Sequence, residues 1–293
     1  MRTSSLLLAV ATLAACTLDI DDQALGPATA GTSVGTSAEL TTTGVQINTL
    51  RAFPGGIHGM AVTDTGRLYF SDSFGSLNAK RFLYFLDPPY TGSITATRTS
   101  GAIPAGLLFD DGFLYLCDVS AGTVRKLDSR LRVVQQWTAS APWNITRLPD
   151  GTLLTVANGG QVQRLENNGT ATTLFSGLDA PFGIASAGDG TVWISEQGAS
   201  APGRVTRRTL TGAVVDTISH GWDNPEGLHV DDAGDLWIAE TSLGQILRYD
   251  GVTLQLVGQN LGLPVVITRR GPGALLASSA NLPAQLLGID ILP

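Results

Sequence analysis

The stretch GLHVDDAGDLWIAE (227–240) consists of a short apolar strand, a tight turn that ends in glycine, and a second apolar strand. The same form recurs at 59–72, 106–118, 144–158, 183–196 and 266–279. The turn glycines of the six copies are Gly66, Gly112, Gly151, Gly190, Gly234 and Gly273. They are 46, 39, 39, 44 and 39 residues apart, a period typical of repeats with four strands per unit. Glycine suits the turn because a tight hairpin requires a positive φ.

Third and fourth strands follow each hairpin, except that the last repeat has no fourth strand before the sequence stops at Pro293. An unpaired sheet edge is a liability that closed β-architectures avoid. The segment VQINTL (45–50) precedes the first repeat and has no other use. We therefore predict an all-β fold over 43–293: a six-bladed β-propeller with four antiparallel strands per blade, in which 45–50 closes the last blade.

The first residues have the form of an export signal, with Arg2, an apolar run and LAAC at 13–16. This ending looks like a bacterial lipobox, which implies cleavage after residue 15 and acylation of Cys16. Residues 16–42 are rich in Ala, Gly, Ser and Thr without apolar periodicity, and we expect a flexible tether. The sequence thus predicts a lipoprotein of the bacterial cell envelope, at the outer membrane or cell surface, attached through its lipid alone.

Charge and cysteine content narrow the possible partners. After removal of Arg2 the chain has 17 basic and 25 acidic residues, a balance of −8, which disfavours nucleic acid. Cys117 is then the one remaining thiol besides the lipidated Cys16, so no internal disulfide is expected. We expect a monomer whose partner is a small molecule or an envelope protein.

The repeat form PxGLxVDxxGxLWxAE, most complete at 225–240, resembles the six-bladed propellers of the NHL-repeat, gluconolactonase-like and strictosidine-synthase-like kind. The resemblance covers 45–293 and implies architecture more than activity, because such propellers include lactonases, lyases and binding scaffolds. Gluconolactonase-like enzymes hold a divalent cation, usually calcium, through acidic and amide side chains at the starts of the innermost strands.

The residues just before the innermost strands differ between repeats, as expected of a functional site on a repetitive background. They are His58, Ala105, Trp143, Phe182, Glu226 and Val265. Only His58 and Glu226 can exchange a proton or bind a metal, so these two are the candidate catalytic and metal-binding residues. Nearby residues of the same loops are candidates for ligand binding: Trp143, Asn144, His220, Trp222 and Asp223.

Other polar positions have a structural explanation. The second strands end at Asp72, Asp118, Glu196 and Glu240, and a feature shared by most blades suggests carboxylates that accept backbone N–H bonds. His229 lies inside a strand and is interpreted as a hydrogen-bonded core histidine, and Cys117 as an inert buried thiol.

Two functions follow from these candidates. The first is an envelope-anchored propeller that binds a small ligand or a protein at the open face of its channel. The alternative is a metal-dependent hydrolase or lyase acting on a lactone or ester, with His58 and Glu226 around one divalent cation, calcium or magnesium. Ala105, Phe182 and Val265 are apolar where the gluconolactonase-like site has oxygen ligands, so that full site does not carry over.

Overall fold

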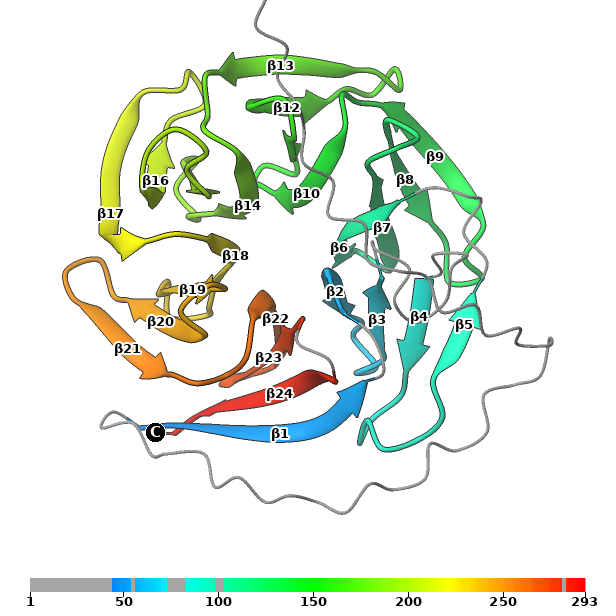
Figure 1. The fold of residues 1–293 in the computed structure, drawn as a ribbon. Helices are drawn as coiled ribbons and strands as arrows, with labels where there is room; N and C mark the ends of the chain where they lie inside the picture. The colour runs from blue at the N-terminus through cyan, green and yellow to red at the C-terminus, as the bar shows by residue number, and fades with distance from the viewer. Residues whose placement is uncertain (1–43, 54–55, 73–82, 98–102, 281–282, 293) are drawn as a thin grey trace, which may run out of the picture.

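A computed structural model describes residues 44–53, 56–72, 83–97, 103–280 and 283–292. These residues form six four-stranded antiparallel sheets around a central axis (Figure 1). The predicted six-bladed β-propeller is confirmed. The predicted signal peptide, Cys16 and the tether lie outside the described residues. Within the described part of the chain, no helix is long and apolar enough to cross a membrane.

Blades 1 to 5 run outward from the channel in chain order, and blade 6 does so except for its outermost strand. Blade 1 contains β2 (Gly59–Val62), β3 (Leu68–Ser71), β4 (Leu83–Leu86) and β5 (Thr95–Thr97). Blade 2 contains β6 (Pro104–Asp110), β7 (Phe113–Asp118), β8 (Thr123–Leu127) and β9 (Val133–Thr138). Blade 3 contains β10 (Pro142–Arg147), β11 (Leu153–Ala157), β12 (Gln161–Leu165) and β13 (Ala171–Ser176).

The second half of the ring repeats this order. Blade 4 contains β14 (Pro181–Ser186), β15 (Val192–Glu196), β16 (Gly203–Arg208) and β17 (Val214–Trp222). Blade 5 contains β18 (Pro225–Val230), β19 (Leu236–Glu240), β20 (Gln245–Tyr249) and β21 (Leu254–Gly258). Blade 6 contains β22 (Pro264–Gly271), β23 (Ala274–Ser279), β24 (Ala284–Ile291) and, outermost, β1 (Val45–Phe53).

The N-terminal strand closes the ring as predicted and is longer than the segment 45–50. β1 pairs antiparallel with β24 from Val45 opposite Ile291 to Phe53 opposite Ala284. This pairing gives the last blade its fourth strand, visible at the lower edge of Figure 1. The two ends of the folded chain are therefore held together in one sheet.

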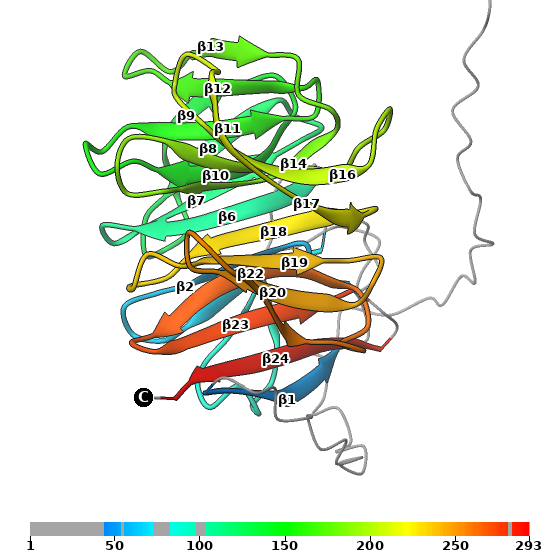
Figure 2. The ribbon, with the colours of Figure 1, turned by 90° about the vertical axis from the view of Figure 1, so that its left-hand side faces the viewer.

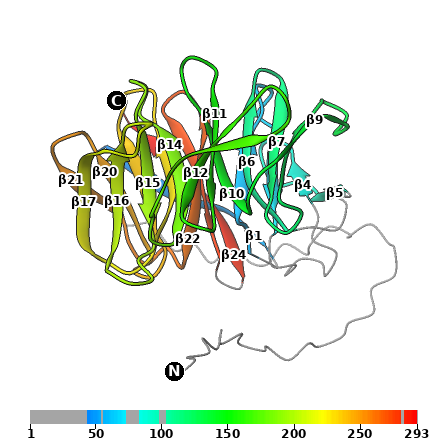
Figure 3. The ribbon, with the colours of Figure 1, turned by 90° about the horizontal axis from the view of Figure 1, so that it is seen from above.

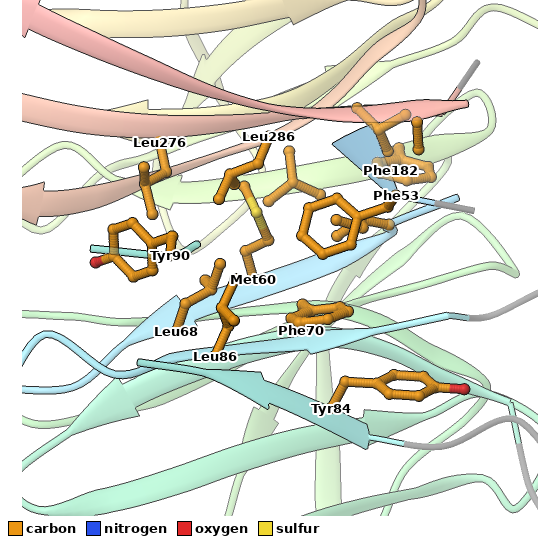
Figure 4. Packing of buried hydrophobic residues seen from close by; sticks show 14 residues of the cluster. Phe53, Met60, Leu68, Phe70, Tyr84, Leu86, Tyr90, Phe182, Leu276 and Leu286 are labelled. Carbon is orange, nitrogen blue, oxygen red and sulfur yellow. The ribbon is translucent and has the colours of Figure 1, made fainter. Parts of the chain in front are cut away.

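The core lies between neighbouring blades, which pack face to face while their strands cross the thickness of the disc (Figures 2 and 3). At the interface of blades 6 and 1, Phe70 and Tyr84 of blade 1 stack with ring centroids 5.3 Å apart. Met60 of blade 1 and Leu286 of blade 6 fill the same layer (Figure 4). Trp237 is fully buried between blades 5 and 6. In the part of the chain that the structure describes, Cys117 is a free buried thiol, so stability there rests mainly on burial of these side chains.

Glycine has two separate uses in the fold. The six turn glycines all have positive φ, from 62° at Gly273 to 91° at Gly234, as predicted from the hairpin form. A second glycine, near the start of the innermost strand, lets neighbouring blades approach. A Cβ on Gly183 would lie against the carbonyl oxygen of Glu226, and one on Gly227 against that of Val265, both far inside van der Waals contact.

Candidate functional site

Six residues before or at the start of the innermost strands surround the channel, and we call them the collar: His58, Ala105, Trp143, Phe182, Glu226 and Val265. All except Ala105 line a cavity of about 310 Å³ on one face of the ring. The residues that directly follow several of them, including Gly59, Asn144 and Gly227, line a second space of about 290 Å³. The collar therefore lies between the cavity and the channel interior.

The remaining walls of the cavity come mainly from residues just after the second strands. Asn158, Gln197, Thr241 and Ala280 each follow the last residue of the second strand in blades 3, 4, 5 and 6. The predicted site missed these four positions. Their shared place in the repeat, one residue beyond the end of the second strand, is the sequence signal that identifies them.

A bulge at the start of β18 positions Glu226. Pro225 pairs with Glu240 and Leu228 with Ile238, and the register shifts between these two pairs. The bulge is fixed from blade 4, because Ser195 Oγ donates a 2.6 Å hydrogen bond to the Glu226 carbonyl oxygen and accepts one of 2.7 Å from the Gly183 N–H. Bulges often redirect a side chain next to a functional site.

Two amides hold the carboxyl group of Glu226. Asn224 Nδ2 donates to Glu226 Oε1 at 2.7 Å, and Gln197 Nε2 donates to the same oxygen at 3.1 Å. Burial, which leaves the residue 7% exposed, raises its pKa to about 7, and the nearby charge of Glu240 adds to this. Hydrogen bonds from Thr241, Asn224 and Gln197 oppose the rise of the pKa. Near neutral pH the carboxyl group therefore exists in both charged and neutral forms.

His58 lies at the same cavity although it comes from blade 1. Its side chain is 9% exposed, and burial lowers its pKa to about 4, against a smaller opposite effect of Asp72. Its backbone N–H donates to the Ser71 carbonyl oxygen at 3.0 Å, which fixes the start of the blade. At neutral pH the imidazole is uncharged.

Aromatic rings provide an apolar wall. Trp143 is half-buried and meets Phe182 edge to face, with ring centroids 5.2 Å apart. Both line the cavity with Val265. The cavity thus combines two titratable groups and several amides with a continuous apolar surface, a pairing common in small-molecule sites.

The other predicted ligand-binding residues do not join this cavity. Asn144 lines the channel on the other side of the collar. His220 and Asp223 are exposed and outside the cavity lining. Trp222 is fully buried in the core between blades 4 and 5, because β17 continues to this residue and directs its ring inward.

The carboxylates at the ends of the second strands have the structural role that the repeat suggested. Asp118 accepts a hydrogen bond from the Ala121 N–H, and Glu196 accepts one from the Asp179 N–H. Glu240 accepts from the N–H groups of Asn224 and Leu243. His229 differs from the predicted hydrogen-bonded core histidine: it is half-buried on the channel side, and its Nε2 has no hydrogen-bond partner among the described residues.

The described residues of the cavity offer fewer ligands than a divalent cation needs. Three collar positions are apolar, Glu226 Oε1 is already bonded to two amide donors, and calcium requires six or more oxygen ligands. Among the residues that the structure describes, no group of three or more His, Cys, Asp or Glu side chains is arranged to hold a metal. Glu226 and His58 were predicted to bind a metal. Among the described residues, no third His, Cys, Asp or Glu side chain joins them as a ligand.

No family model and no curated protein matches this chain. Among solved structures, a gluconolactonase from Xanthomonas campestris is similar with a TM-score of 0.67 and 18% identity, over 85% of this chain and 90% of that one. A streptogramin B lyase is similar with a TM-score of 0.64 and 18% identity, over 84% and 98%. The virginiamycin B lyase of Staphylococcus aureus is similar with a TM-score of 0.60 and 15% identity, over 85% of this chain and 99% of that one. The chain thus shares the six-bladed fold of gluconolactonase-like and lyase propellers.

Proposed function

We propose that this protein is an envelope-anchored lipoprotein whose propeller binds a small ligand in the collar cavity. The observation that supports this most is Glu226: a carboxyl group buried in an otherwise largely apolar cavity, held by amides from two blades. Burial of such a group costs free energy in a purely structural role. A ligand that bonds to it would offset that cost.

The lining indicates the chemistry of the ligand. Among the described residues, no Lys or Arg lines the cavity, so none of these side chains balances an anion. Neutral His58 and the amides of Asn158 and Gln197 offer hydrogen bonds, while Trp143 and Phe182 offer apolar contact. We propose an uncharged, amphiphilic small molecule that exchanges hydrogen bonds with Glu226.

A second candidate is catalysis by proton transfer on a lactone or ester. Glu226, with a pKa of about 7, can donate a proton at neutral pH, and uncharged His58 can accept one. These complementary states in one cavity favour a hydrolase or lyase as the alternative. Lactonase and lyase are the activities named for two of the similar structures.

The lipid anchor rests on the sequence. LAAC at 13–16 would provide the acylated Cys16, and residues 17–42 would separate the propeller from the membrane. A tether of some 25 residues has a root-mean-square length of about 25–30 Å. The ligand site would then face the space around the membrane rather than the lipid.

A lactone series tests both functions with one probe set. γ-Lactones with increasing alkyl tails are titrated into wild-type protein and into Glu226→Gln, with Glu166→Gln as control because Glu166 lies outside the cavity and pairs with Arg164. Binding lost only in Glu226→Gln supports the binding site. Acid release followed by pH-stat separates hydrolysis from binding. Binding unchanged in Glu226→Gln would contradict the proposal.

A further inference from the structure

Gln197 occupies a special place relative to Glu226. It is the first residue after β15 in blade 4, yet its amide reaches across the blade boundary to Glu226 Oε1 at 3.1 Å. Both side chains line the same cavity. Asn224, the other donor to this oxygen, comes from the loop that directly precedes β18.

We propose that Gln197 is the positioning residue of the collar cavity: it orients the Glu226 carboxyl group from the neighbouring blade and sets how readily that group gives up its proton. This inference rests on the proposed role of Glu226. Asn224 is joined to Glu226 by two peptide bonds and moves with it. Gln197 is anchored independently, so it restrains the carboxyl group relative to the cavity.

The neighbouring contacts make Gln197 a fixed donor. Glu196, one residue earlier, is fully buried and bonded to Arg204, Arg208 and the Asp179 N–H. The Gln197 backbone N–H donates to the Ala180 carbonyl oxygen at 3.0 Å. The backbone of Gln197 is therefore held at its own N–H and through the preceding residue, and its amide approaches Glu226 from a defined direction.

A hydrogen bond donated to a carboxylate stabilises the charged form, so its removal favours the neutral form. Gln197→Met keeps the length of the side chain and removes the donor. We expect the midpoint of the Glu226 carboxyl titration to rise by about 0.5–1 pH unit in this variant. Gln197→Glu is a second test: its carboxyl group and that of Glu226 would share a proton and titrate as a coupled pair, with the upper of two apparent midpoints raised.

The titration is measurable without any ligand. The chain has five glutamates, Glu39, Glu166, Glu196, Glu226 and Glu240, so carboxyl-carbon NMR of the labelled full mature chain can resolve Glu226. The control is Gln163→Met, because Gln163 is buried in blade 3, bonds to the Ser140 N–H and does not line the cavity.

The outcomes are distinct. A raised midpoint in both Gln197 variants, with none in Gln163→Met, supports the inference. A lowered Tm with an unchanged Glu226 midpoint would show a merely structural role and overturn it. Because no ligand is involved, a failure of the lactone titrations would count against the proposed function and leave this result standing.

Discussion

Ser195 of blade 4 donates a 2.6 Å hydrogen bond to the carbonyl oxygen of Glu226 in blade 5. The same position in blade 1 is Ser71, whose hydroxyl donates to the Ala105 carbonyl oxygen at 2.7 Å. In blade 6, Ser278 donates to the Ile57 carbonyl oxygen at 3.1 Å and so links the last blade to the first. One set of contacts therefore joins blades and, in blade 5, also fixes the candidate site.

Replacement of Gly183 by Ala should disturb this contact between blades 4 and 5. A Cβ there would clash with the Glu226 carbonyl oxygen and lie 2.9 Å from Ser195 Oγ, so the blades must separate or the bulge must move. We expect a loss of about 2–3 kcal/mol in the free energy of unfolding, measured by denaturant titration. Gly271→Ala is the control, since a Cβ there meets no atom within 4 Å. Equal stability of the two variants would contradict this account of blade packing.

Ser195→Ala should affect both stability and the site. Loss of its hydroxyl leaves the buried Gly183 N–H and Glu226 carbonyl oxygen without this partner, at a cost of about 1–3 kcal/mol. Ser71→Ala removes a similar contact between blades 1 and 2. We expect both variants to lower the Tm, but only Ser195→Ala to shift the Glu226 titration. An equal shift of the Glu226 titration in Ser71→Ala would contradict a local effect of Ser195 and indicate a disturbance of the whole propeller.

The contribution of Glu226 to the free energy of unfolding should fall with rising pH. Its pKa is about 7 in the folded protein and near 4.5 when unfolded, so the folded state binds more protons between these values. The contribution is present below pH 4.5 and is lost as pH rises through 7. Relative to Glu226→Gln, wild-type stability should drop by about 2–3 kcal/mol between pH 4 and pH 8. A constant difference across that range would show that the carboxyl group has an ordinary pKa.

Cys16→Ser should release the protein from membranes if the lipobox prediction holds. The wild-type protein is expected in the detergent phase after partition in a cloud-point detergent, and the variant in the aqueous phase. Cys117→Ser is the matched control, because the Cys117 thiol is fully buried. Recovery of Cys16→Ser in the detergent phase would contradict lipid attachment at this residue.

The repeat made the fold predictable because each blade has the same physical requirement. Gly234 and its counterparts must adopt positive φ, and the missing strand of the last blade must be supplied by 45–50. The site was harder to predict, because convergence of His58 and Glu226 depends on how blades 1 and 5 face the axis. Trp222 shows the limit: its loop position suggested ligand binding, but the length of β17 determines that it is buried.

Gln197 shows a second limit of prediction from sequence. Its place after the second strand marks Gln197 as a candidate wall residue, but its hydrogen bond to Glu226 depends on how blades 4 and 5 are placed relative to each other. The comparison of the four positions that follow the second strands would have singled out these residues as variable.

The most direct test of the central claim is NMR detection of the Trp143 indole and the Glu226 carboxyl group during titration with the γ-lactone series. Lactones that bind should perturb both signals, and Glu226→Gln should weaken their binding at least about tenfold at pH 6, consistent with one lost hydrogen bond to a buried group. Lactones that bind without perturbing either signal, or that bind Glu226→Gln equally well, would contradict the collar cavity as the functional site.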